Sequence, residues 1–187
     1  MSERRIRTAR NRERDDVMHA LESSRSFMRA WGNPQWERSF PTRAELTSEL
    51  RRGTLMVCEE EGEGVVGCFV LAPGPDPCYL RIDGGDWLDD GPYFVVHRFA
   101  TLRQGNGVGS FMMAWLCETA DSLRMDTHEL NLPMQGLLER HDFRRCGVIC
   151  LSNGEERLAY QYLSPTHEPG PQGILEWLPW RKGGLGK

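Results

Sequence analysis

The chain has 187 residues, of which 39% are hydrophobic and 27% are charged, and its formal net charge is -4. This length and composition predict one folded domain, and the acidic balance argues against nucleic acid as the main partner. No stretch is apolar over the ~20 residues that a membrane span needs, and no apolar run follows the charged start of the chain as in a secretory signal. We therefore expect a cytoplasmic protein with no membrane partner.

Periodicity and turn residues predict an alternating order of strands and helices. Apolar residues at spacings of three and four predict helices, and short apolar runs bounded by glycine, proline or charged turns predict strands. Thr42 and Glu45 form the T-x-x-E pattern of a capping box, and Asn153-Gly154 is typical of a hairpin turn. The expected strands span residues 6–9, 54–58, 65–71, 93–100, 123–128, 146–151 and 157–163, and the expected helices span residues 15–31, 42–52, 108–121 and 133–141.

These elements predict a mixed α/β fold in a single domain over residues 1–163. A tail over residues 164–187 follows, rich in proline and glycine at first and then carrying an apolar patch at 174–180. Two interpretations of the patch stay open: it docks on its own domain, or it forms the contact of a homodimer.

A glycine-rich segment, residues 103–110, lies between a predicted strand and a predicted helix. Its glycines, Gly105, Gly107 and Gly109, remove side chains where the chain turns. Backbone N–H groups can then point into one concavity at the start of a helix, which suits a diphosphate. A plain tight turn is the alternative without a ligand.

Three phosphate-binding patterns compete for this segment. A Walker A loop is excluded, because the chain contains no Gly-Lys-Ser or Gly-Lys-Thr. A dinucleotide fingerprint, G-x-G-x-x-G from Gly105, would need glycine where Ser110 stands. The third pattern, Q/R-x-x-G-x-G/A, is satisfied from Gln104 to Gly109.

With this segment the chain resembles the GNAT family of acetyl-CoA-dependent N-acetyltransferases, over roughly residues 4–163. The resemblance rests on Gln104-Gly-Asn-Gly-Val-Gly109 after a strand, then on residues 125–131 and 133–143 in this order. Residues 92–100 and 157–160 look like those of one bacterial branch of the family. The resemblance implies a mixed sheet of about six to seven strands with a splayed central parallel pair, flanked by about four helices.

The resemblance also implies the cosubstrate, acetyl-CoA, and the residues that bind it. Its pantetheine arm would contact backbone groups of Phe99, Ala100 and Thr101, and Asn131 would reach toward the same arm. Backbone amides would hold the diphosphate along the stretch of Gln104, Gly105, Asn106, Gly107, Val108, Gly109 and Ser110. The implied reaction is direct attack of a primary amine on the thioester in a ternary complex, the acceptor being a small-molecule amine or a protein N-terminus.

The family's usual acid, a tyrosine, is absent, because its position holds Leu138. This departure keeps open an alternative function, a catalytically impaired CoA-binding sensor or interaction module. A binder of another nucleotide is a third hypothesis.

The reaction needs a group that accepts the proton of the amine, and two histidines are candidates. His97 lies on the strand before the glycine-rich segment, and His128 lies on the next strand, where Asp126 could orient it. The alternative for each is a packed histidine bonded to a neighbour.

Other residues could shape an acceptor site. Trp36 and Trp87 could form its walls, and a cationic amine could be steered by nearby carboxylates. The six cysteines show no C-x-x-C pair, so we expect no metal site. The steering carboxylates would be those of Asp83, Asp86, Asp89, Asp90 and Glu129.

Overall fold

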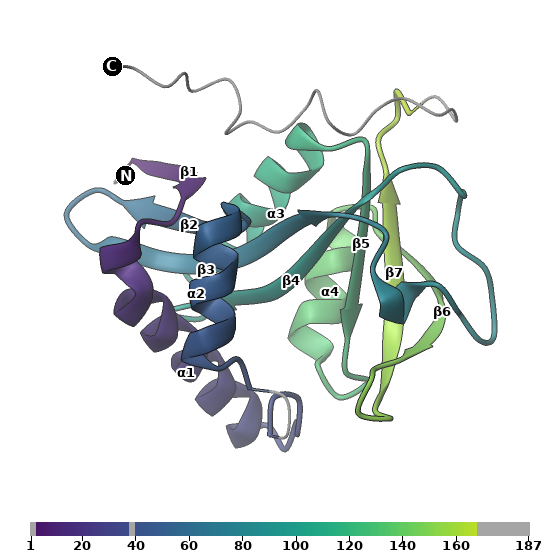
Figure 1. Cartoon of the computed structure of the whole chain (residues 1–187), viewed down its shortest axis with the longest axis horizontal. Helices are drawn as coiled ribbons and strands as arrows, with labels where there is room; N and C mark the ends of the chain where they lie inside the picture. The colour runs from purple at the N-terminus through teal and green to yellow at the C-terminus, as the bar shows by residue number, and fades with distance from the viewer. Residues whose placement is uncertain (1–2, 38–39, 168–187) are drawn as a thin grey trace.

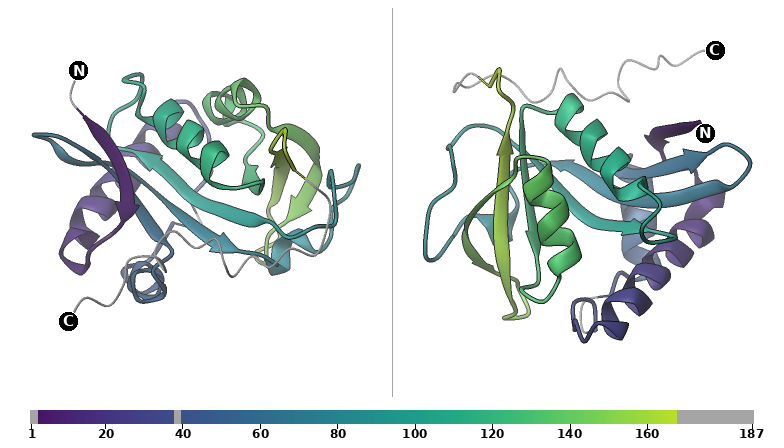
Figure 2. Two further views of the ribbon diagram at one scale, coloured as in Figure 1. Left: turned by 90° about the horizontal axis from the view of Figure 1, so that it is seen from above. Right: turned by 180° about the vertical axis from the view of Figure 1, so that it is seen from behind.

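The computed structural model describes residues 3–37 and 40–167, and one seven-stranded sheet runs through it. The strand order is β1-β2-β3-β4-β5-β7-β6. Neighbouring strands are antiparallel except for the parallel pair β4 and β5. Helices α1 and α2 cover one face of the sheet, and α3 and α4 cover the other (Figures 1 and 2). The predicted mixed sheet with a central parallel pair and flanking helices is confirmed.

Every helix and strand expected from the sequence is present, with ends that differ by a few residues. The strands are β1 (Arg4–Thr8), β2 (Leu55–Glu60), β3 (Gly64–Pro73), β4 (Phe94–Thr101), β5 (Ser122–Thr127), β6 (Arg144–Cys150) and β7 (Glu156–Leu163). The helices are α1 (Arg14–Ala30), α2 (Arg43–Arg52), α3 (Val108–Thr119) and α4 (Leu132–Arg140), with short 3-10 turns at Asn11–Glu13 and Pro77–Tyr79.

The ends of α2 are set by local sequence. The Thr42 hydroxyl accepts from the Glu45 N–H at 3.2 Å, and the Glu45 carboxylate accepts from the Thr42 N–H at 2.7 Å. This reciprocal pair is the predicted capping box. Gly53 ends the helix in the left-handed region, at φ 71°. α2 is therefore held with fixed ends against the front face of the sheet, the face that α1 also covers (Figure 1).

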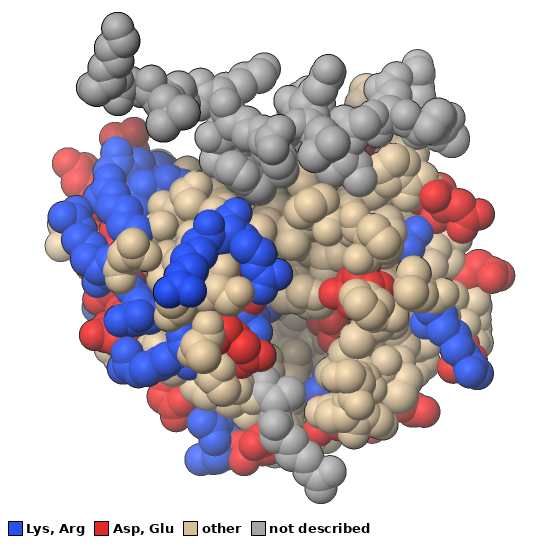
Figure 3. Space-filling view, viewed as in Figure 1, with Lys and Arg blue, Asp and Glu red and all other residues tan. Residues whose placement is uncertain are grey.

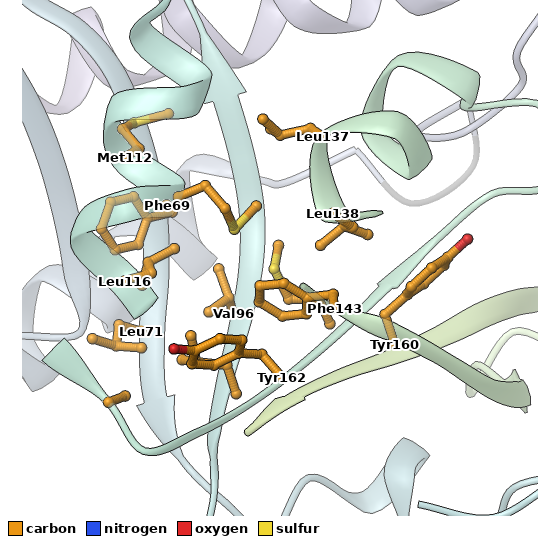
Figure 4. Packing of buried hydrophobic residues seen from close by; sticks show 14 of the residues in the cluster. Phe69, Leu71, Val96, Met112, Leu116, Leu137, Leu138, Phe143, Tyr160 and Tyr162 are labelled. Atoms are coloured by element: carbon orange, nitrogen blue, oxygen red, sulfur yellow. The ribbon is translucent and has the colours of Figure 1, made fainter. Parts of the chain in front are cut away.

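The two faces of the sheet carry separate apolar cores. Behind the sheet, Met112 and Leu116 of α3 and Leu138 of α4 pack with Phe69 of β3 (Figure 4). In front, Leu21 of α1 and its neighbours pack on β2 and β3. Because apolar side chains alternate to both faces, β3 is buried along almost its whole length.

The long connection between β3 and β4, residues 74–93, covers the front of the β5–β7 half of the sheet. Tyr79 is buried there, and the Trp87 indole N–H donates to its carbonyl at 3.0 Å. Arg124 of β5 lies 4.2 Å from the Trp87 ring centroid and 3.9 Å from that of Tyr93. This cation–π arrangement fixes the connection over the sheet, beside the splayed strands.

Two expectations from the sequence concern the C-terminal tail and membrane-spanning helices. The apolar patch at 174–180, and most of the predicted tail, lie outside the described residues. Over the described ranges, no helix has the length and apolar character needed to span a bilayer.

Candidate active site

The parallel strands β4 and β5 separate soon after they begin. They pair only at Phe94 with Leu123 and at Val95 with Arg124, although both strands continue beyond these residues. The gap opens into a cavity of about 700 Å³. Where two neighbouring strands separate, their facing backbone N–H and C=O groups make no hydrogen bonds between the strands. These groups are therefore free to bind a ligand.

The cavity reaches both faces of the sheet. On the rear face it is bounded by the loop after β4 and by one side of α4. On the front face it lies between α2 and the β3–β4 connection, where Figure 3 shows a hollow. We call this front part the acidic end, because the described carboxylates that line the cavity lie there: Glu45, Glu49, Asp76 and Asp126.

A β-bulge shapes β4 beside the gap. Val70 of β3 is opposite His97, and Cys68 of β3 is opposite Ala100. Between these two pairs, β4 therefore contains one more residue than β3. Arg98 takes up the extra residue with φ 55°, in the left-handed region. Such a bulge leaves a residue without ladder partners and redirects the strand, and it is frequent beside active sites. A left-handed arginine costs energy and persists only when its surroundings fix it.

The surroundings that fix Arg98 are carboxylates of α2. Its Nη1 donates to Glu49 Oε1, and its Nη2 lies 3.3 Å from Glu45 Oε1. The side chains of Arg98 and Glu49 are 18% and 13% exposed, so solvent screens this pair little. The bulge is thus tied to a helix that lines the same cavity.

Glu49→Gln is expected to lower the free energy of unfolding by roughly 1.5–3 kcal/mol, because the largely buried hydrogen bond to Arg98 loses the negative charge of its acceptor. Urea denaturation measures this value. The control is Glu37→Gln, which breaks the exposed pair with Arg29 and is expected to change nothing measurable. Equal effects of the two substitutions would contradict a role for Glu49 in fixing the bulge.

The glycine-rich loop, residues 104–110, forms the rear end of the cavity. Gly105 and Gly107 have φ values of 78° and 80°, and a Cβ on Gly105 would meet no atom within 4 Å. A Cβ on Gly107 would meet only Arg4 Nη1, at 3.5 Å. Gly107 is the N-cap of α3 and supplies no side-chain hydrogen bond. The Val108 N–H donates to Asn106 Oδ1 at 3.3 Å, and the N–H groups of Gly109 and Ser110 keep their capacity for a ligand. This concavity suits an anion.

β1 supports the glycine-rich loop. Arg4 Nη2 donates to the Asn106 carbonyl at 3.0 Å, and Arg4 Nε donates to Glu60 at 2.8 Å. Gln104 Nε2 donates to the Thr101 hydroxyl at 2.9 Å, which ties the loop to the end of β4. The loop is held from two sides, while Gly105 faces open space.

His97 lies at the acidic end between two carboxylates. Its Nε2 is 2.9 Å from Asp76 Oδ2, and its Nδ1 is 3.8 Å from Asp126 Oδ1. The Tyr79 hydroxyl donates to Asp126 Oδ1 at 2.7 Å, and the Tyr79 ring packs beside the imidazole. Two segments distant in sequence from His97, the turn at residues 76–79 and β5, therefore fix the orientation of this histidine.

The environment of His97 moves its pKa upward. Burial alone lowers the pKa of His97, but the hydrogen bond to Asp76 and the charges of Asp126 and Asp76 outweigh it. The same hydrogen bond holds the pKa of Asp76 below its usual range. Burial raises the pKa of Tyr79, so this phenol keeps its proton and remains a donor.

His128 occupies a different position. It does not line the cavity, and its Nδ1 accepts from the Leu130 N–H at 3.1 Å. Asp126, its predicted partner, instead contacts Tyr79 and His97. The structure thus brings His97, and not His128, together with the glycine-rich loop around one cavity.

Asn131 lines the cavity but is already hydrogen-bonded. Its Oδ1 accepts from the Met134 N–H at 3.3 Å, as an N-cap of α4, and its Nδ2 donates to Gln35 Oε1 at 2.8 Å. Gln35 Oε1 also accepts from the Thr127 hydroxyl at 3.3 Å. The connection after α1 is therefore tied to the end of β5 and the start of α4.

The remaining predicted residues divide into two groups. Phe99, Ala100, Thr101 and Trp36 line the cavity, as do all residues of the glycine-rich loop except Val108. The Val108 side chain is fully buried in the core behind the sheet. Trp87 does not line it; it packs on Tyr79 and Arg124 instead. None of the five carboxylates proposed to steer an amine is among the described lining residues: Asp83, Asp86, Asp89, Asp90 and Glu129.

Among the lining residues that sequence reasoning missed, three have contacts that shape the site. Asp76 stands in a proline-rich loop, and only its fold-dependent contact with His97 gives it a role. Arg98 and Glu49 meet across 49 residues of sequence, so no local pattern marks them. Among the described residues, no cluster of three potential metal ligands occurs.

Comparisons with known proteins agree with this geometry. The family model of the acetyltransferase (GNAT) family matches residues 18–143. The chain belongs to the GNAT acetyltransferase family. A search of curated proteins found no match.

Solved structures place the GNAT fold on nearly the whole domain. A GNAT-family acetyltransferase from Streptococcus agalactiae is 30% identical, with a TM-score of 0.81, over 87% of this chain and 96% of that chain. One from Listeria monocytogenes is 16% identical, with a TM-score of 0.62, over 86% and 94%. The ribosomal-protein-S18-alanine N-acetyltransferase from Escherichia coli is 10% identical, with a TM-score of 0.58, over 89% and 97%. The last two show the fold alone.

Proposed function

We propose that this GNAT protein is an N-acetyltransferase that moves acetyl from acetyl-CoA to a primary amine by direct attack in a ternary complex. One observation carries the proposal. The parallel strands open onto a cavity with a glycine-rich helix start at one end and a histidine between two carboxylates at the other. The diphosphate would bind at the glycine-rich end of the cavity, and proton transfer would take place at the acidic end.

The residues present fit acetyl-CoA. The concavity beside Gly105 and Gly107 is open, and the N–H groups of Gly109 and Ser110 at the start of α3 suit its diphosphate. Phe99, Met134 and Leu137 give the gap an apolar wall for the pantetheine arm, and backbone groups from Phe99 to Thr101 lie beside it. One N–H of Asn131 Nδ2 donates to Gln35, and the other contacts Met28 Sδ at 3.5 Å. Asn131 would reach this arm by releasing the weak contact with Met28, or by accepting at the second lone pair of Oδ1.

Acetyl-CoA supplies an activated acetyl thioester. An N–H released by the bulge at Arg98 would donate to the thioester carbonyl, where negative charge develops. Leu138 is fully buried in the core and does not line the cavity, so no acid acts from the family's tyrosine position. A thiol of pKa ~8.5 leaves without a strong acid.

His97 accepts the proton of the attacking amine. In its neutral form Nε2–H donates to Asp76, which leaves the Nδ1 lone pair directed toward the side of Asp126. The proton is taken up at Nδ1, and the two carboxylates stabilise the resulting imidazolium. This is general base catalysis, which typically contributes 10²–10⁴-fold to the rate.

Two measurements test the proposed function. Acetyl-CoA at 100 times its Kd should stabilise the protein by about 2.7 kcal/mol, and NAD or ATP should not. Release of free thiol should then follow addition of an amine from a panel of alkylamines, amino-acid amides and peptides. No thermal shift at millimolar acetyl-CoA overturns the proposal.

The same experiment separates the alternatives. Binding of acetyl-CoA without transfer to any amine would favour a catalytically impaired sensor or interaction module. A shift with NAD or ATP alone would favour a binder of another nucleotide.

A further inference from the structure

The two ends of the cavity differ in the charge of the residues that line them. At the rear end the described charged lining residues are Arg103 and Arg140, beside the glycine-rich loop and on α4. At the acidic end four carboxylates face two arginines and His97. The rear end thus favours an anion, and the acidic end favours a cation.

The two arginines of the acidic end are already paired. Arg98 contacts Glu49 and Glu45. Arg157 is 3% exposed, and its Nη2 lies 2.5 Å from Glu155 while its Nη1 donates to the Glu156 carbonyl at 2.9 Å. Among the described lining residues, the acidic end therefore offers no unpaired guanidinium to a carboxylate of the acceptor.

Asp126 retains capacity to accept hydrogen bonds. Its Oδ1 is bonded to the Tyr79 hydroxyl, while Oδ2 has Arg157 Nε at 4.0 Å, beyond hydrogen-bond distance. Oδ2 can therefore receive an ammonium N–H beside His97. A carboxylate attached next to that ammonium would be brought against Asp126 and Asp76.

From this arrangement we infer that the acceptor is a cationic amine with no carboxylate next to the reacting nitrogen. Amino-acid amides, peptide N-termini and simple alkylamines belong to this class, and free amino acids do not. Like charges brought together in a partly desolvated site are strongly disfavoured, whereas the ammonium itself is attracted. This inference rests on the proposed function and specifies the substrate class of the same site.

The test compares amines that share one skeleton. Alanine, alaninamide and ethylamine form a small set, and phenylalanine, phenylalaninamide and phenethylamine form a larger one. With wild-type protein we expect kcat/KM for the amide to exceed that for the free amino acid by at least about tenfold in the set that is acetylated faster. Comparison of amide with alkylamine shows whether the acceptor resembles a peptide N-terminus or a small alkylamine.

Asp126→Asn then tests the cause. The amide-to-acid ratio should fall several-fold toward one, and because it is a ratio, the intrinsic reactivity of each amine cancels. Asp83→Asn is the control, since Asp83 is exposed and does not line the cavity; its ratio should equal that of the wild type.

Three outcomes would overturn the inference. In the first, the wild-type protein acetylates the free amino acids as well as their amides, which leaves the proposed function intact. In the second, the ratio stays unchanged in Asp126→Asn. In the third, no amine of the wider panel is acetylated, and the proposed function fails as well.

Discussion

Replacing Gly107 by valine is expected to weaken acetyl-CoA binding at least about 100-fold, or roughly 2.7 kcal/mol. Gly107 starts α3 at φ 80°, and only Arg4 lies near the space where a side chain would stand. A branched side chain would fill the concavity into which the first N–H groups of α3 point. Isothermal titration calorimetry with acetyl-CoA measures the loss.

The control for this substitution is Gly84→Val. Gly84 has φ 73° and open space around it, so valine there carries the same left-handed strain, of order 1–3 kcal/mol, far from the loop. Both variants should lose similar stability, and only Gly107→Val should lose affinity. Equal affinity in the two variants would contradict a role of the loop in phosphate binding.

Substituting His97 by glutamine is expected to lower kcat by about 10²–10⁴-fold while acetyl-CoA affinity changes little. The wild-type rate should rise with pH through the raised pKa of His97, because only the neutral imidazole accepts a proton. In the variant this rising limb should disappear. Steady-state rates over a pH series, with calorimetry for the cosubstrate, provide both values.

His128→Gln is the matched comparison for His97. His128 does not line the cavity, and its ring accepts from a local backbone N–H. Its substitution should leave the pH profile unchanged. A profile altered by His128→Gln and unaltered by His97→Gln would reverse the assignment.

The sequence predicts the helices and strands because interactions between residues close in sequence form them. The capping box of Thr42 and Glu45, the glycine at the end of α2 and the apolar spacing in α1 each act within a few residues. The glycine-rich loop is equally local, so its place between β4 and α3 follows from the sequence.

The acidic end could not be predicted in this way. His97 meets Asp76 across 21 residues and Asp126 across 29, and these contacts depend on how the β3–β4 connection folds over the sheet. The bulge at Arg98 leaves no sequence mark, because a left-handed arginine contradicts local preference and is fixed by α2. The sequence also does not show that the five predicted steering carboxylates stay outside the lining of the cavity, four of them in the later part of the β3–β4 connection and Glu129 between β5 and α4.

The most direct test of the account is a crystal structure of the protein with CoA. The account predicts the diphosphate within hydrogen-bond distance of the N–H groups at the start of α3, and the sulfur between β4 and β5 beside His97. CoA bound elsewhere, or a gap between β4 and β5 that holds no CoA at saturating concentration, would contradict it.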